Sequence, residues 1–130
     1  MKIGNIELGD FPLLLAPMED VSDPPFRSVC KENGADLMFT EFISSEGLIR
    51  NAEKSTQKLD IYDSERPIGI QIFGDKIESM KKAASISEAA NPEIIGAENE
   101  VPLATRIVES KSATTADTPC AQTLGLILPS

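Results

Sequence analysis

The sequence contains no histidine and no tryptophan, and only two of its 130 residues are cysteines. Without imidazole side chains, Ser-His-Asp triads and histidine-ligated metals are excluded. Cys30 and Cys120 lie far apart and match no metal-binding spacing, so we expect no metal site. Their number does not indicate a secreted disulfide framework. We therefore expect a cytoplasmic protein.

Long apolar runs are also missing. The longest, residues 11–18, is too short and too interrupted by proline to span a bilayer. The first residues do not form a basic leader followed by an apolar run of signal length, so we expect no membrane association.

Basic residues are few: 12 lysines and arginines stand against 21 aspartates and glutamates, which gives a net charge of −9. The chain therefore has no general electrostatic attraction for a phosphate backbone, which argues against nucleic-acid binding by this chain alone. Its length predicts one domain and falls short of the roughly 250 residues of a complete eight-unit barrel.

The chain is organised around the apolar run Leu13–Ala16, which is typical of a strand buried on both faces of a parallel sheet. Pro17 has no N–H for a sheet ladder and ends the strand. Met18, Glu19 and Asp20 are therefore expected at the carboxyl end of the strand, where α/β sheets and barrels place their ligands.

A helix is predicted to follow, capped at Ser22 or Asp23 and closed at Gly34. Its predicted inward face is formed by the apolar residues at helical spacing, Phe26, Val29 and Cys30. On this face Cys30 acts as a small buried hydrophobe and not as a nucleophile.

Further strands are predicted at 37–42, 67–73 and 93–95, each about one βα unit after the last. Residues 2–8 alternate around Gly4-Asn5 and predict a small hairpin. The expected fold is therefore α/β: a partial TIM (β/α) barrel of about four βα units with an N-terminal β-hairpin, over residues 1–95.

Short helices are predicted at 44–50 and at 75–90, the second capped by Asp75. The predicted apolar stripe of the second helix packs on the sheet and is formed by Ile77, Met80, Ala83, Ala84, Ile86 and Ala90.

Two polar residues stand out in the apolar strands. Gln71 is predicted on the opposite face of its strand from Ile70. A buried glutamine there needs a ligand, a water or a polar network for its hydrogen bonds. Glu41 is expected at the carboxyl end of the second strand, beside the loop of the first. It either lines a pocket as an acceptor, or is satisfied by neighbouring backbone N–H groups or solvent.

The string Ala-Pro-Met-Glu-Asp-Val-Ser-Asp-Pro-Pro-Phe-Arg at 16–27 resembles the flavin-binding opening of the tRNA-dihydrouridine synthases. These are FMN-dependent barrels that reduce uridine in tRNA. Residues 34–45 and 67–74 resemble two further blocks of the family, in the same order, so the resemblance covers about residues 1–95.

The resemblance implies an FMN-dependent oxidoreductase that uses NADPH to form 5,6-dihydrouridine in tRNA. It implies that Pro17, Met18 and Glu19 border the flavin and that Gln71 hydrogen-bonds the flavin ring. The resemblance thus implies a flavoprotein that uses FMN and NADP in tRNA processing, with tRNA as its partner.

The resemblance fails after Ile95. Where the family has Asp-Ile-Asn-x-Gly-Cys-Pro, residues 96–102 read Gly-Ala-Glu-Asn-Glu-Val-Pro. The family cysteine is the acid that protonates the uracil ring, and Val101 in its place cannot donate a proton. The segment 96–130 also omits the family's later lysine, its glycine-rich phosphate loops and its tRNA-gripping helical domain. We therefore identify no catalytic residue and expect a truncated, inactive synthase.

The divergent tail, 96–130, is predicted to be helical over 101–110 and to lack stable order over 111–123. It is explained by a truncated or rearranged gene, or by an internal deletion that leaves 118–125 as a remnant of the lysine-bearing strand. The alternative function is a non-catalytic partial barrel that is unstable or pairs with another chain, because an open sheet leaves its strand edges unpaired.

Overall fold

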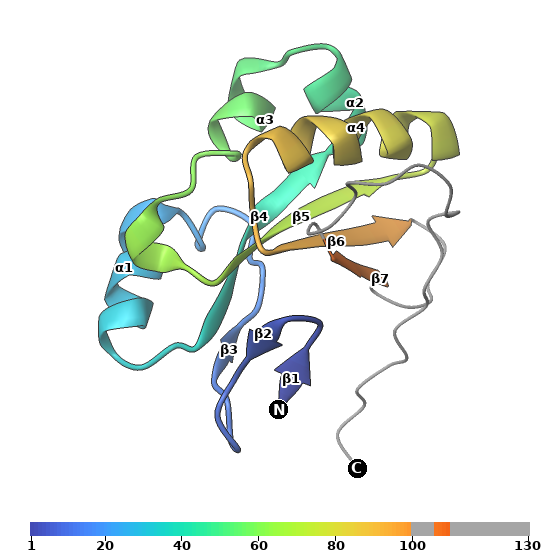
Figure 1. Cartoon of the computed structure of the whole chain (residues 1–130). Helices are drawn as coiled ribbons and strands as arrows, with labels where there is room; N and C mark the ends of the chain where they lie inside the picture. The colour runs from blue at the N-terminus through green and yellow to red at the C-terminus, as the bar shows by residue number, and fades with distance from the viewer. Residues whose placement is uncertain (100–105, 110–130) are drawn as a thin grey trace.

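The computed structural model describes residues 1–99 and 106–109, which form a five-stranded sheet with helices on one side (Figure 1). The sheet order is β3-β4-β5-β6-β7, and the first four strands run parallel. The strands are β3 (Leu14–Leu15), β4 (Leu37–Ser44), β5 (Ile68–Gly74), β6 (Ile94–Asn99) and β7 (Arg106–Glu109). The predicted run of adjacent parallel βα units is confirmed.

The helices are α1 (Pro24–Glu32), α2 (Ser45–Ile49), α3 (Glu53–Gln57) and α4 (Ile77–Ala89), with a short 3-10 helix, η1 (Asp63–Glu65). An antiparallel hairpin, β1 (Lys2–Ile3) with β2 (Ile6–Glu7), precedes the sheet, as predicted. Figure 1 shows the hairpin at the opposite end of the molecule from α2 and α3. None of the helices in the described ranges is long and apolar enough to cross a membrane.

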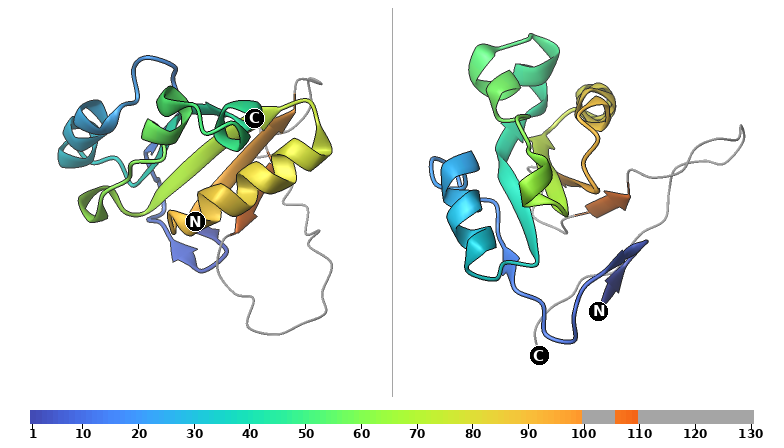
Figure 2. Two further views of the ribbon diagram at one scale, coloured as in Figure 1. Left: turned by 90° about the horizontal axis from the view of Figure 1, so that it is seen from above. Right: turned by 60° about the vertical axis from the view of Figure 1, so that its left-hand side comes forward.

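Each face of the sheet has its own core. α4 lies along β5 and β6 (Figure 2), and the core on this helix-covered face consists of Ile43, Leu48, Ile70, Ile72, Ala83 and Ile95. On the other face the hairpin residue Ile3 packs against Leu37, Phe39 and Ile94. Burying each of these large side chains contributes about 1.5–3 kcal/mol, so the central strands carry most of the apolar stabilisation.

A β-bulge divides β4. Phe39 pairs with Gly69 and Phe42 with Gln71, so β4 advances three residues where β5 advances two. The Gln71 backbone N–H donates to the Thr40 side-chain hydroxyl at 3.2 Å, which replaces the ladder bond that the bulge removes. The bulge places Phe42 on the same face of the sheet as Gln71.

The prediction that Leu13–Ala16 is buried on both faces is wrong. Only Leu14 and Leu15 form β3, and Leu13 and Leu14 are 62% and 45% exposed. β3 is an edge strand: β4 covers one side, and no strand in the described residues pairs with the other.

The predicted caps of α1 are confirmed, but its predicted inward face is wrong. The Asp23 side chain accepts from the Phe26 N–H, and the chain turns at Gly34 with φ +98°. Phe26 and Val29 are exposed, and Cys30 is half-buried, less buried than predicted. The helix presents Arg27 to the interior instead.

Arg27 is buried because Glu65 of η1 neutralises it. The guanidinium meets both carboxylate oxygens, with Nε at 3.0 Å and Nη2 at 3.1 Å, and both side chains are 2% exposed. It also donates to the carbonyls of Ser22 and Asp60. A salt bridge that is this fully hydrogen-bonded holds α1 and the 60–65 segment together.

The cap and stripe predicted for the fourth helix are partly wrong. Lys76, not Asp75, is the N-cap residue, and it makes no side-chain capping bond. Ile77 and Ile86 are exposed, whereas Ala83 is buried and Met80, Ala84 and Ala90 pack partly against the core. Two serines of this helix, Ser79 and Ser87, are also buried.

In the segment predicted to be helical, 101–110, the structure has a strand. β7 pairs antiparallel with β6, Ile94 opposite Glu109 and Ala97 opposite Arg106. The prediction of disorder for 111–123 lies outside the described residues, as do Val101 and Cys120.

Candidate functional site

The loop after β3 carries three of the residues proposed for the site. Pro17 and Met18 are half-buried and Glu19 is exposed. The buried Ser22 hydroxyl accepts from the Met18 N–H at 2.8 Å and donates to the Met18 carbonyl at 2.9 Å. The loop is therefore closed on itself and held at the carboxyl end of the sheet.

Glu41 fastens this loop to β4. Its Oε1 accepts from the backbone N–H of Asp20 at 2.7 Å, and Asp20 has a left-handed φ of +57°. Of the two interpretations left open for Glu41, the structure favours the carboxylate that is satisfied by a neighbouring backbone N–H.

Gln71 lies in the middle of β5 and is 2% exposed. Its register partner on β6 is Gly96, and a Cβ on that glycine would lie 2.1 Å from the Gln71 Oε1. Among residues 1–98 no group forms a hydrogen bond with the Gln71 carboxamide, and the bond between Gln71 and Thr40 uses the Gln71 backbone N–H. A buried amide is normally hydrogen-bonded, so the side chain is suited to a polar ligand on this face.

The structure does not bring all four predicted residues into contact. Pro17, Met18 and Glu19 share one loop, whereas Gln71 lies two strands away with β4 between them. The bulge in β4 connects the two parts, because Glu41 holds the loop and Phe42 pairs with Gln71.

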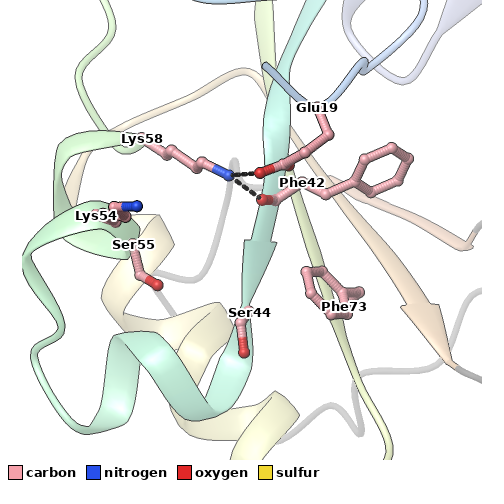
Figure 3. Close-up of a pocket in the computed structure, with 7 residues that line it drawn as sticks. All are labelled: Glu19, Phe42, Ser44, Lys54, Ser55, Lys58 and Phe73. Atoms are coloured by element: carbon pink, nitrogen blue, oxygen red, sulfur yellow. Dashed lines mark hydrogen bonds and ion pairs between the residues drawn. The ribbon is translucent and has the colours of Figure 1, made fainter.

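Beside this region a pocket opens between α3 and the carboxyl ends of β4 and β5 (Figure 3). Its volume is about 190 Å³, and it is lined by Glu19, Phe42, Ser44, Lys54, Ser55, Lys58 and Phe73. The Lys58 ammonium donates to the Glu19 carboxylate and to the Phe42 carbonyl, the latter at 3.2 Å. This ion pair joins α3 to the loop after β3.

The lysines of this pocket were not among the predicted site residues. Lys54 and Lys58 are four residues apart, so a helix places them on one face. This spacing is visible in the sequence. Nothing in the sequence of residues 51–66 indicates, however, that this segment packs against the ends of β4 and β5. The buried pair of Arg27 and Glu65 was missed for the same reason, since 38 residues separate its members.

Three carboxylates also gather here. Oxygens of Glu19, Asp20 and Glu41 lie within 4.8 Å of one another. Glu19 is paired with Lys58, and Glu41 accepts from the Asp20 N–H, so both already have partners within the protein.

Comparison with known proteins gives a consistent result. The model of the dihydrouridine synthase family matches residues 14–97. A probable tRNA-dihydrouridine synthase of Rickettsia prowazekii is 38% identical over 96 residues, which cover 73% of this chain and 29% of that protein. The tRNA-dihydrouridine synthase B of Pasteurella multocida is 36% identical over 95 residues, covering 73% and 28%. The chain spans less than a third of the length of these relatives.

Proposed function

The chain belongs to the dihydrouridine synthase family, and we propose that it supplies the first part of a flavin site for the reduction of uridine in tRNA. The observation that supports this proposal is the buried Gln71 carboxamide, which has no hydrogen-bond partner among residues 1–98 and lies over Gly96. A flavin ring offers the carbonyl and N–H edges that such an amide requires.

The residues that would hold FMN are Gln71 and the loop of Pro17, Met18 and Glu19. FMN held there would supply hydride transfer from NADPH to the uracil ring. Gln71 would orient the ring, and the loop would border it in the position that Ser22 and Glu41 hold. The protein's part in such chemistry is positioning and proton supply.

Proton supply is the part that this chain lacks. Val101 stands at the position of the family's cysteine acid, and a missing general acid costs about 10²–10⁴ in rate. The family's phosphate-binding loops have no match in the sequence, and phosphate contacts are strong charge-assisted bonds. We therefore propose that this chain, in the cytoplasm, does not complete the reaction by itself.

The first prediction concerns colour and turnover. The purified chain should be colourless, and with added FMN, NADPH and unmodified tRNA it should form no detectable dihydrouridine. Flavin absorbance and nucleoside analysis of the tRNA measure the two outcomes. A yellow protein that forms dihydrouridine would show that residues 96–130 replace the lost acid and would overturn the proposal of inactivity.

The second prediction tests the flavin site itself. Gln71→Leu should weaken the remaining FMN affinity by about 0.5–1.5 kcal/mol, because it removes a hydrogen bond to the ring. Isothermal titration with FMN measures this loss. The matched control is Gln57→Leu on the exposed face of α3, which should not change FMN affinity. If the parent chain and both variants bind FMN with equal affinity, Gln71 is not part of the flavin site.

A second candidate function, a non-catalytic partial barrel that pairs with another chain, is favoured by one observation. Phe11, Leu13 and Leu14 are 95%, 62% and 45% exposed at the outer edge of β3. Exposed apolar edges of this kind promote strand pairing between chains.

A further inference from the structure

The pocket beside α3 combines an aromatic wall with a basic rim. Phe42 and Phe73 meet edge to face, with ring centroids 6.4 Å apart and planes at 79°. Both residues are half-buried and line the pocket, and Figure 3 shows the Phe42 carbonyl facing Lys58 while the Phe42 ring points away from the lysines. Such surfaces accept flat apolar rings, nucleobases among them.

The two lysines of the pocket differ in their availability. Lys58 is neutralised by Glu19 and is held further by the Phe42 carbonyl. Lys54 is exposed, and in the described part of the chain it forms no ion pair with an acidic residue. The positive charge of Lys54 is therefore free to meet an anion.

Two hydroxyl groups complete the lining. Ser44 accepts from the Gly47 N–H at 3.3 Å, which leaves its own O–H to donate. Ser55 approaches α2 closely, since a Cβ on Gly47 would lie 2.1 Å from its Oγ. The pocket thus offers donors for phosphate or ribose oxygens next to an aromatic wall.

We propose that this pocket binds one nucleotide of a single-stranded RNA segment, with the base against the Phe73 ring and the phosphate beside Lys54. The inference rests on the proposed function, in which RNA is the substrate class, and it assigns to that function a second subsite beside Gln71. The recognition needs no base-specific hydrogen bonds, because every base offers a flat face for stacking.

A nucleotide is also part of NADPH, so the test must separate the two sources. Binding of a fluorescently labelled oligouridylate to the full chain is measured by anisotropy at several salt concentrations, without flavin. The same proteins are titrated separately with NADPH. Neither measurement depends on the reduction of uridine.

Lys54→Gln should weaken oligouridylate binding about threefold to tenfold at low salt. It should also lower the slope of log K against log salt concentration by about 0.7, the value for one phosphate contact on a single strand. Phe73→Leu should weaken binding about tenfold with the slope unchanged, because stacking is insensitive to salt. The matched control is Lys2→Gln, which removes an exposed charge from the hairpin at the other end of the sheet and should change neither quantity.

Three results would overturn the inference: no binding of oligouridylate by the parent chain, equal effects of the Lys54 and Lys2 changes, or binding of NADPH alone with the same dependence on Lys54. Lys54 is exposed, so its variant keeps the test valid even if Phe73→Leu does not fold. If these binding effects are found while Gln71→Leu leaves FMN affinity unchanged, the flavin proposal fails and the RNA subsite stands. If Gln71→Leu weakens FMN binding while the oligouridylate effects are absent, only the proposed RNA subsite fails.

Discussion

At the scale of single residues, the most consequential contact is the buried pair of Arg27 and Glu65. Both charges are removed from water, so the folded state is stable only if each charge is neutralised and hydrogen-bonded by its partners. Besides Arg27, the Glu65 carboxylate accepts from the Tyr62 backbone N–H at 3.0 Å, so the pair also fixes the turn that begins η1.

Glu65→Gln should lower the free energy of unfolding by about 3–5 kcal/mol, because it leaves Arg27 buried without its countercharge. Urea denaturation measures the loss. The double variant Arg27→Met with Glu65→Leu should be less destabilised than the single one, since both charges are then absent. Arg50→Gln, at a pair in which Arg50 is 76% exposed, should cost less than about 1 kcal/mol. A small effect of Glu65→Gln would contradict the structural role given to the pair.

At the scale of elements, α2 and α4 are joined by Glu46. The Ser79 hydroxyl of α4 donates to its carboxylate, and Lys76 and Arg50 lie near it. The Ser79 hydrogen bond, with these two cations, holds the pKa of Glu46 below its ordinary value of 4.5. Because the folded-state pKa is the lower one, this contribution to stability is present above about pH 4.5 and is lost as the pH falls through the folded value.

Ser79→Ala should therefore destabilise the protein most near neutral pH, and the difference from the parent chain should shrink below pH 4.5. Urea denaturation at a series of pH values measures this. Ser85→Ala, on the exposed face of α4, should give a difference that does not change with pH. A pH-independent effect of Ser79→Ala would show that the hydroxyl acts only by packing.

At the scale of the whole molecule, the exposed edge of β3 is where we expect another chain to pair. Leu14→Lys should reduce concentration-dependent self-association without loss of stability, because a charged edge resists pairing with another strand. Sedimentation velocity over a range of concentrations is the measurement. Ile77→Lys is the control, since Ile77 is 68% exposed on α4, away from the edge, and its change should leave association unaltered. A parent chain that is monomeric throughout would refute this role of β3.

The central strands were predictable from the sequence because each is a short apolar run bounded by turn residues. The predictions failed where distant partners decide burial. Nothing near Arg27 shows that Glu65 will neutralise it, so the helical spacing of Phe26 and Val29 suggested the wrong face. Leu13 and Leu14 look like core residues, and only the sheet order shows that they lie at an edge.

The candidate site, like the fold, was predictable only in part. Gln71 stood out as a polar residue in an apolar strand, and its burial is confirmed. Its role toward a flavin remains a prediction, as do those of Pro17, Met18 and Glu19. The pocket of Lys54 and Phe73 was not predictable, because it depends on how the 51–66 segment returns to the strand ends.

The bulge in β4 has a consequence for how this strand tolerates change in length. Strict alternation would place Ile43 on the face of Leu37 and Phe39, but Ile43 belongs to the opposite core. The strand is thus two segments of opposite phase, joined at residues 40 and 41. Loss of one residue at this joint would restore a single phase and would leave Phe42 and Ile43 on the faces that they now occupy. A deletion at the joint therefore costs the contact of the residue removed, which is the Thr40 bond to the Gln71 N–H or the Glu41 bond to the Asp20 N–H, and not the order of the strand's faces.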